Sequence, residues 1–92
     1  MDTRDRLHEK LAAAFEPAEV LDVIDESAGH AGHREASAGG HFRVIIVSEA
    51  FEGLSRVERQ RRVYDAVADE MSGAVHALTM TCLTPAEYSA EA

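Results

Sequence analysis

Two strand-like segments separated by a helix-length segment constrain the fold of this chain most. Residues 41–48 are rich in β-branched side chains, and residues 75–81 form a shorter segment of the same kind. Such side chains pack well on a pleated surface, so both segments are predicted strands. Residues 55–72 lie between them and have helical periodicity. Because a helical crossover favours a right-handed, parallel connection, we expect the two strands to lie parallel in one sheet.

The predicted crossover helix begins with a capping box, in which Ser55 and Glu58 each accept from the backbone N–H of the other. Its expected apolar face comprises Val57, Tyr64, Val67, Ala68 and Met71. The helix also carries a basic cluster, Arg56, Arg59, Arg61 and Arg62, with Arg59 and Arg62 expected to point away from the apolar face. This cluster is most simply a solvated surface, and a surface for an acidic partner is the alternative.

The amino-terminal part of the chain predicts one helix and one more strand. Leu7, Leu11 and Phe15 are spaced four residues apart, which is typical of an amphipathic helix over residues 3–15. Residues 20–25 contain enough β-branched side chains for a strand. We expect this strand to pair antiparallel with the strand that follows it.

The complete order of predicted elements is helix, strand, strand, helix, helix, strand, helix. A short helical turn at residues 49–53 precedes the crossover helix, and Thr84-Pro85 begins a last short helix. This order predicts an α+β fold (α/β in the broad sense) with a three-stranded mixed sheet and helices packed on one face. We expect a single domain over residues 1–92, with residues 27–40 forming a flexible loop between the first two strands because they are rich in small and polar residues.

Charge and composition exclude several classes of function. Nine basic and seventeen acidic residues give a net charge of −8, which repels nucleic-acid phosphates and anionic lipids. Cys82 is the single cysteine, no signal-peptide core follows the amino terminus, and no apolar run approaches the roughly 20 residues of a membrane span. We therefore expect a soluble cytoplasmic protein. The chain also lacks a nucleophile elbow and a phosphate-binding glycine loop, which argues against an enzyme.

Four histidines and one cysteine could bind a metal ion: His30, His33, His41, His76 and Cys82. Strand periodicity predicts that His76 shares one face with Leu78, Met80 and Cys82, at the rim of the core. Cys82 cannot bind the same ion as His76, because six residues of extended strand span about 20 Å. His76 is then either a packing histidine or a metal ligand joined by a loop histidine. Because a structural zinc site takes four ligands, a partner would have to complete a tight site.

A series of short fragments, in order along nearly the whole chain, resembles one known family. The fragments are Asp25-Glu26-Ser27 with His30, His41-Phe42, Val47-Ser48, Phe51-Glu52-Gly53, Arg59 to Tyr64, Val75 to Leu78, and Thr84-Pro85. Together they resemble the BolA family. This resemblance implies an α-β-β-α-α-β fold similar to the class II KH fold. Gln60 departs from the pattern, since many members have histidine there.

The resemblance also implies a function and a partner. His76 matches the family's invariant histidine, and His30 matches a loop position that carries His or Cys; His33 is a competing loop ligand. In this family the two residues help to hold a bridging 2Fe–2S cluster, whose other ligands come from a monothiol glutaredoxin of the Cys-Gly-Phe-Ser type and its glutathione. We thus expect a non-enzymatic adaptor in iron–sulfur cluster assembly, cluster trafficking or iron regulation, with no cofactor in the isolated chain.

The alternative function implied by the resemblance is DNA-binding transcriptional regulation. Arg59, Arg61 and Arg62 would provide the nucleic-acid or partner surface. The net charge of −8 argues against this alternative, and any DNA binding should be weak.

Overall fold

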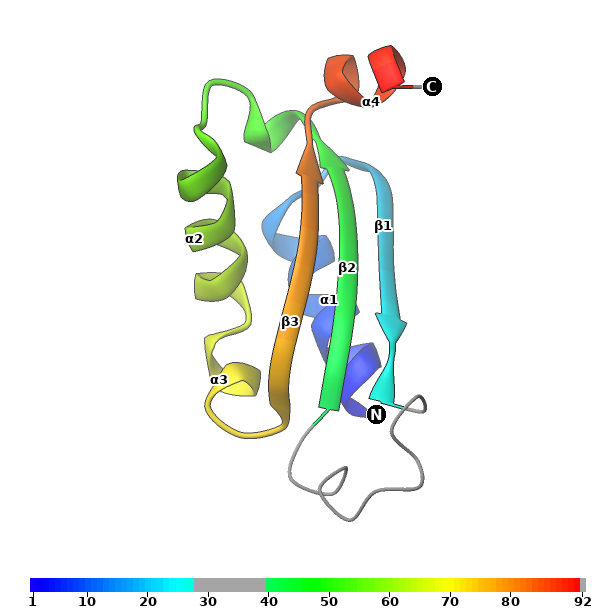
Figure 1. Cartoon of the computed structure of the whole chain (residues 1–92), viewed down its shortest axis with the longest axis vertical. Helices are drawn as coiled ribbons and strands as arrows, with labels where there is room; N and C mark the ends of the chain where they lie inside the picture. The colour runs from blue at the N-terminus through cyan, green and yellow to red at the C-terminus, as the bar shows by residue number, and fades with distance from the viewer. Residues whose placement is uncertain (28–39, 92) are drawn as a thin grey trace.

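A computed structural model of the chain describes residues 1–27 and 40–91. Its sheet has three strands, β1 (Ala18–Asp25), β2 (Gly40–Ser48) and β3 (Val75–Leu83), in the order β1-β2-β3. β1 pairs antiparallel with β2, and β2 pairs parallel with β3 (Figure 1). The prediction of a three-stranded mixed sheet is therefore confirmed, including the parallel pair that the helical crossover favoured. The predicted loop at residues 27–40 lies almost entirely outside the described residues.

The helical elements also follow the predicted order. They are α1 (Thr3–Ala14), the 3₁₀ helix η3 (Glu49–Phe51), α2 (Arg56–Ala66), α3 (Ala68–Met71) and α4 (Pro85–Glu91). The predicted capping box of Ser55 with Glu58 forms at the start of α2, and Thr84 forms a second one with Glu87 at the start of α4. These bonds satisfy backbone N–H groups that a helix start leaves without intrahelical partners.

The crossover helix is not continuous, which corrects the prediction of one helix to Ser72. Val67 adopts φ −117° and ψ 28°, outside the helical region, and separates α2 from α3. The side chain of Val67 is fully buried, so the chain changes direction at a residue that is anchored in the core. On α3, the buried carboxylate of Glu70 then lies 2.9 Å from Nζ of Lys10 on α1.

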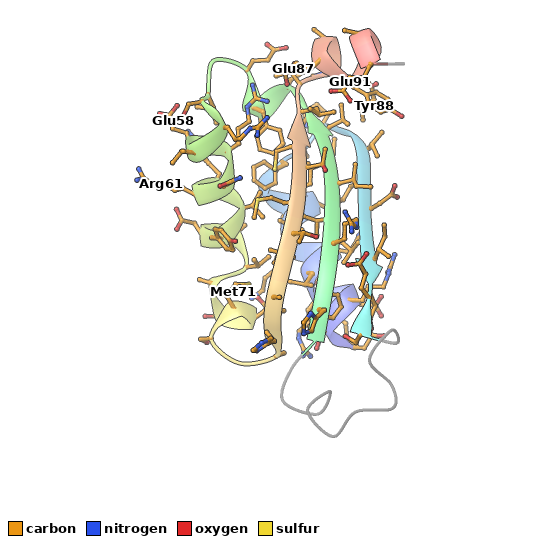
Figure 2. All side chains as sticks on the ribbon, viewed as in Figure 1. Glu58, Arg61, Met71, Glu87, Tyr88 and Glu91 are labelled. Carbon is orange, nitrogen blue, oxygen red and sulfur yellow. The ribbon has the colours of Figure 1, made fainter. Side chains whose placement is uncertain are left out.

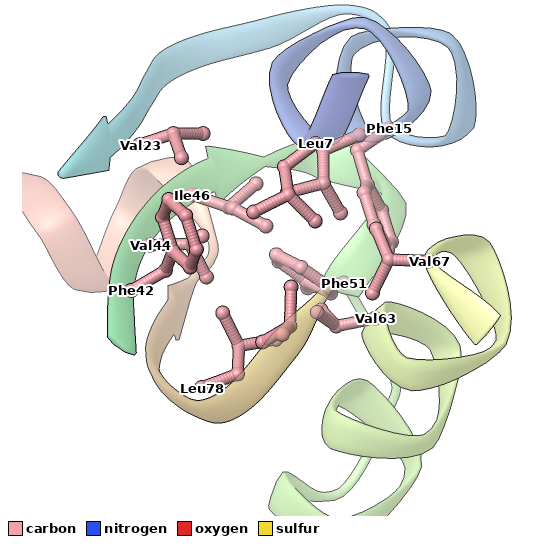
Figure 3. Close-up of a cluster of buried hydrophobic side chains, with 12 residues drawn as sticks. Leu7, Phe15, Val23, Phe42, Val44, Ile46, Phe51, Val63, Val67 and Leu78 are labelled. Atoms are coloured by element: carbon pink, nitrogen blue, oxygen red, sulfur yellow. The ribbon is translucent and has the colours of Figure 1, made fainter. Parts of the chain in front are cut away.

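The hydrophobic core lies between one face of the sheet and helices α1 and α2. Leu7 and Leu11 come from α1, Val63 from α2, and Val44 and Ile46 from β2; all five are fully buried. Figure 3 shows these elements surrounding the cluster of buried side chains. The helix α4 instead lies beyond the carboxyl ends of β2 and β3 (Figure 1). The described part of the chain contains no helix that is long and apolar enough to cross a membrane.

The buried face of α2 differs from the predicted one. Val57 and Tyr64, predicted to face inward, are 55% and 41% exposed, whereas Val67 is fully buried as predicted and Val63, outside the predicted face, is fully buried too. The buried stripe of α2 begins with Arg59, one helical turn before Val63. The side chain of Arg59 is only 13% exposed. Hydrophobic periodicity therefore placed Val67 correctly but Val57 and Tyr64 wrongly, because an arginine occupies the first position of the buried stripe.

Candidate functional site

The amino-terminal ends of β2 and β3 bring two histidines together. His41 is the second residue of β2 and His76 the second residue of β3. Because the strands are parallel, both begin at the same end of the sheet. The centroids of the two imidazole rings lie 5.2 Å apart, with 36° between the ring planes. The sequence indicated both histidines as possible ligands but not as neighbours. Their neighbourhood could have been predicted, because each histidine lies near the start of one of two strands that were expected to be parallel.

A register shift in the parallel pair sets the position of His76. Gly40 pairs with Val75 but His41 pairs with Ala77, so His76 is the extra residue on β3. Val75 is 3% exposed and Leu78 is 8% exposed, although strict alternation would place them on opposite faces. His76 is exposed between them. The prediction that His76 shares one face with Leu78, Met80 and Cys82 is therefore wrong. The interpretation of His76 as a packing histidine is wrong as well, because its side chain is exposed.

Backbone hydrogen bonds hold the end of β2 that carries His41. The His41 N–H donates to Oγ of Ser27 at 2.9 Å, and the His41 carbonyl accepts from the Glu26 N–H at 2.7 Å. The Ser27 N–H in turn donates to Oδ1 of Asp25 at 2.8 Å. These bonds fix the backbone of the segment 25–27 against the start of β2.

Gly40 ties the same end of the sheet to β3. Its N–H donates to the carbonyl of Ala74 at 2.9 Å. A Cβ at Gly40 would overlap the ring of Phe42 and would lie 3.1 Å from Oγ of Ser27. Only glycine therefore allows this approach of the strand to the Phe42 ring and to Ser27.

The donor set at this end fits a partial metal site. Imidazole nitrogen binds iron, zinc, copper and nickel. The described residues include no group of three or more His, Cys, Asp or Glu side chains that could hold a metal ion. His30 and His33, predicted as loop ligands, lie outside the described residues. The described residues thus supply two neighbouring imidazoles, and a complete metal site would need further ligands.

The opposite end of the sheet holds Arg59 in a network of internal contacts. Its guanidinium donates to the carbonyls of Leu54 and Cys82, each at 3.0 Å, and to both carboxylate oxygens of Glu87, at 2.7 and 3.2 Å. It also lies 5.9 Å from the centroid of the Phe51 ring. Arg59 therefore stabilises the junction of α2, β3 and α4, which differs from the predicted solvated arginine. Arg61 and Arg62 are exposed, and Figure 2 shows Arg61 pointing away from the sheet.

Two pKa shifts follow from this network. Hydrogen bonds from Arg59 and from the Thr84 N–H lower the pKa of Glu87 to about 2. Burial raises the pKa of the Cys82 thiol to about 11, although Arg59 opposes this shift. Since a metal ligand or nucleophile must be a thiolate, a thiol protonated at neutral pH is a poor candidate for either role. Cys82 is partly buried and lies at the opposite end of β3 from His76.

Comparison with known proteins places the chain and its fold in one family. The family model for BolA-like protein matches residues 11–87. The chain belongs to the BolA family. It is 41% identical over 88 residues to the DNA-binding transcriptional regulator BolA of Escherichia coli, covering 96% of this chain and 81% of that protein. The solved structure of BolA1 from Arabidopsis thaliana superposes with a TM-score of 0.83 at 37% identity, covering 95% of this chain and 96% of the other.

Some BolA relatives are longer than this chain. BolA-like protein 1 of Mus musculus is 46% identical over 79 residues, which cover 86% of this chain but 56% of the mouse protein. The chain thus spans about half the length of that relative. The names of these relatives describe a regulator and BolA-like proteins and mention no enzymatic activity.

Proposed function

We propose that this BolA-family chain is a non-enzymatic adaptor that binds a monothiol glutaredoxin and shares a bridging 2Fe–2S cluster with it. The observation that carries the proposal is the exposed His76 beside His41 at one end of the sheet, in a chain of this family. His76 is the proposed ligand from the sheet, and His30 is the proposed ligand from the loop, with His33 as its competitor. Glutaredoxin and its glutathione complete the ligand set.

The arrangement suits a cluster that two proteins hold together. Because His76 is exposed, an iron carried by a partner can approach the ring without disruption of the core. The hydrogen bonds of His41 with Ser27 and with Glu26 keep the neighbouring strand in place during docking. When bound, the cluster would supply electron-transfer or cluster-donor chemistry, and imidazole in place of thiolate raises its reduction potential. The proposed role is in cluster assembly, cluster trafficking or iron regulation.

The proposal is tested by co-production with a glutaredoxin of the Cys-Gly-Phe-Ser type. The wild-type chain should give a coloured heterodimer, and His76→Ala should change its visible absorption and circular dichroism and speed the loss of the cluster. His8→Ala, on α1, is the matched control and should leave the spectrum unchanged. An identical spectrum and cluster lifetime in His76→Ala would refute the assignment of this ligand. Comparing His30→Ala with His33→Ala then identifies the loop ligand.

A second candidate function is DNA-binding transcriptional regulation, which the name of the Escherichia coli relative favours. The exposed Arg61 and Arg62 on α2 could contact phosphates, whereas Arg59 is held by Glu87. The net charge of −8 opposes such binding. Duplex affinity measured against salt concentration tests this candidate: a slope near zero, or binding only in the millimolar range, counts against it. If the candidate is correct, Arg61→Ala should reduce the slope by about one.

A further inference from the structure

The pairing of His41 and His76 supports an inference that does not depend on glutaredoxin. We propose that the two imidazoles chelate a single divalent ion of the first transition series in the isolated chain. Imidazole suits zinc, copper and nickel, and water would complete the coordination. This two-histidine site consists of described residues of the sheet and requires no loop histidine.

The distance between the rings fits such a chelate. A tetrahedral ion with metal–nitrogen bonds of about 2 Å holds the centres of two imidazole rings roughly 5 Å apart. The centroids of His41 and His76 are 5.2 Å apart. The rings are inclined by 36°, which differs from a parallel stack and is compatible with two nitrogens converging on one ion. Small rotations of the side chains are then sufficient to direct both nitrogens at the metal.

The backbone beneath the pair lowers the cost of binding. His41 is fixed by two hydrogen bonds, from its N–H to Ser27 and from Glu26 to its carbonyl. His76 is the extra residue between Val75 and Ala77, and because these two residues pair with Gly40 and His41, the β2–β3 pairing holds the His76 backbone beside His41. Preorganised ligands lose little conformational entropy when they bind, so two imidazoles on a sheet bind more tightly than two on a flexible segment.

Exposure and charge also favour a cation at this position. The His76 side chain is exposed and His41 is partly exposed, so a hydrated ion can reach both. The net charge of −8 attracts cations to the surface as a whole. With only two protein ligands, we expect an exchangeable ion rather than the permanent structural zinc of a four-ligand site. An ion bound here would compete with any partner for His76.

Titration of the isolated chain with Zn²⁺ in a calorimeter tests the proposal. The wild type should bind one ion at this site, and His41→Ala and His76→Ala should each weaken binding by roughly tenfold or more, because the loss of either ring removes the chelate effect. The double variant His41→Ala/His76→Ala should bind at least as weakly as either single variant, because it has lost both imidazoles. His8→Ala and the double variant His30→Ala/His33→Ala are the controls and should retain the wild-type affinity. Wild-type affinity in His41→Ala, or loss of binding in the loop variant, would overturn the proposal.

Two further measurements separate this proposal from its alternatives. Side-chain NMR should show the His41 and His76 rings shifting together at the same Zn²⁺ concentration, whereas independent shifts would refute a shared ion. His41→Asn is a second, polar substitution at the same position. Circular dichroism of each variant establishes whether the sheet remains folded. The glutaredoxin experiment fails or succeeds separately: if His76→Ala alters the shared cluster while His41→Ala retains Zn²⁺ affinity, the adaptor function stands and the chelate is wrong.

Discussion

The two ends of the parallel pair β2 and β3 use charged and titratable side chains in opposite ways. At the carboxyl end, Arg59 and Glu87 form an ion pair and Arg59 also binds two backbone carbonyls. At the amino end, His41 and His76 lie side by side, and His76 is exposed. The first arrangement joins three elements of the chain, whereas the second presents a ring to solvent. We infer that the arginine end serves stability and that the histidine end serves binding.

The largest expected effect on stability is at the arginine end. Arg59→Ala should lower the free energy of unfolding by about 1–3 kcal/mol, because it leaves the Cys82 and Leu54 carbonyls and the Glu87 carboxylate without their partner. Urea denaturation measures this change. Arg61→Ala, on an exposed position of the same helix, is the control and should change stability by less than about 0.5 kcal/mol. Equal effects of the two substitutions would contradict the structural role of Arg59.

A smaller effect at the same end depends on pH. The folded-state pKa of Glu87 is about 2, below its ordinary value of 4.5, so the ion pair contributes stability that is complete above pH 4.5. As pH falls from about 4.5 to 2, Glu87 takes up a proton and this contribution is lost. Glu87→Gln should therefore be less stable than the wild type at pH 7, and the difference should shrink across this window. The measurement is urea denaturation at a series of pH values.

The control for this pH dependence is Glu91→Gln, which removes a carboxylate from the same helix and leaves the Arg59–Glu87 pair intact. It should lose stability on acidification as the wild type does. A constant stability difference between Glu87→Gln and the wild type from pH 7 to 2 would show that the ion pair does not form in solution.

The smallest expected effect on stability is at the histidine end. His76→Ala should change the free energy of unfolding by less than about 0.5 kcal/mol, because its ring is exposed and no core packing is lost. Its neighbour Val75 is 3% exposed, and Val75→Ala should cost about 1–3 kcal/mol by leaving a cavity. Thermal and urea denaturation compare the two variants. A large loss of stability in His76→Ala would mean that the ring has a structural role after all.

Sequence periodicity was sufficient to predict the fold, but it did not predict the buried face of every helix and strand. The strands at residues 41–48 and 75–81, with a helical crossover between them, predicted the parallel pair because such connections have one favoured hand. The inward face of α2 was mispredicted because Arg59 occupies an inward position and Tyr64 an outward one. A long arginine side chain can bury its stem and still satisfy its charge, which a hydrophobicity pattern does not register.

The site was predictable in its components but not in its geometry. The sequence singled out His76 and the other candidate histidines, and the resemblance to the BolA family gave His76 its proposed role. Neither indicated that His76 would face solvent, because strict strand alternation placed it with Leu78. The register shift between Gly40 and His41 changed that orientation, and such a shift depends on how the two strands pack together.

The sequence by itself determined the order of elements, the parallel pair and the family, since these follow from local periodicity and from short motifs along the chain. Only the tertiary structure decided which arginine is held inside and which histidines are neighbours. These outcomes depend on contacts between residues far apart in sequence: Arg59 meets Glu87 across 28 residues, and His41 meets His76 across the β2–β3 pairing. The physical reason is that side-chain neighbours are set by strand register and helix packing, which no single segment of the chain encodes alone.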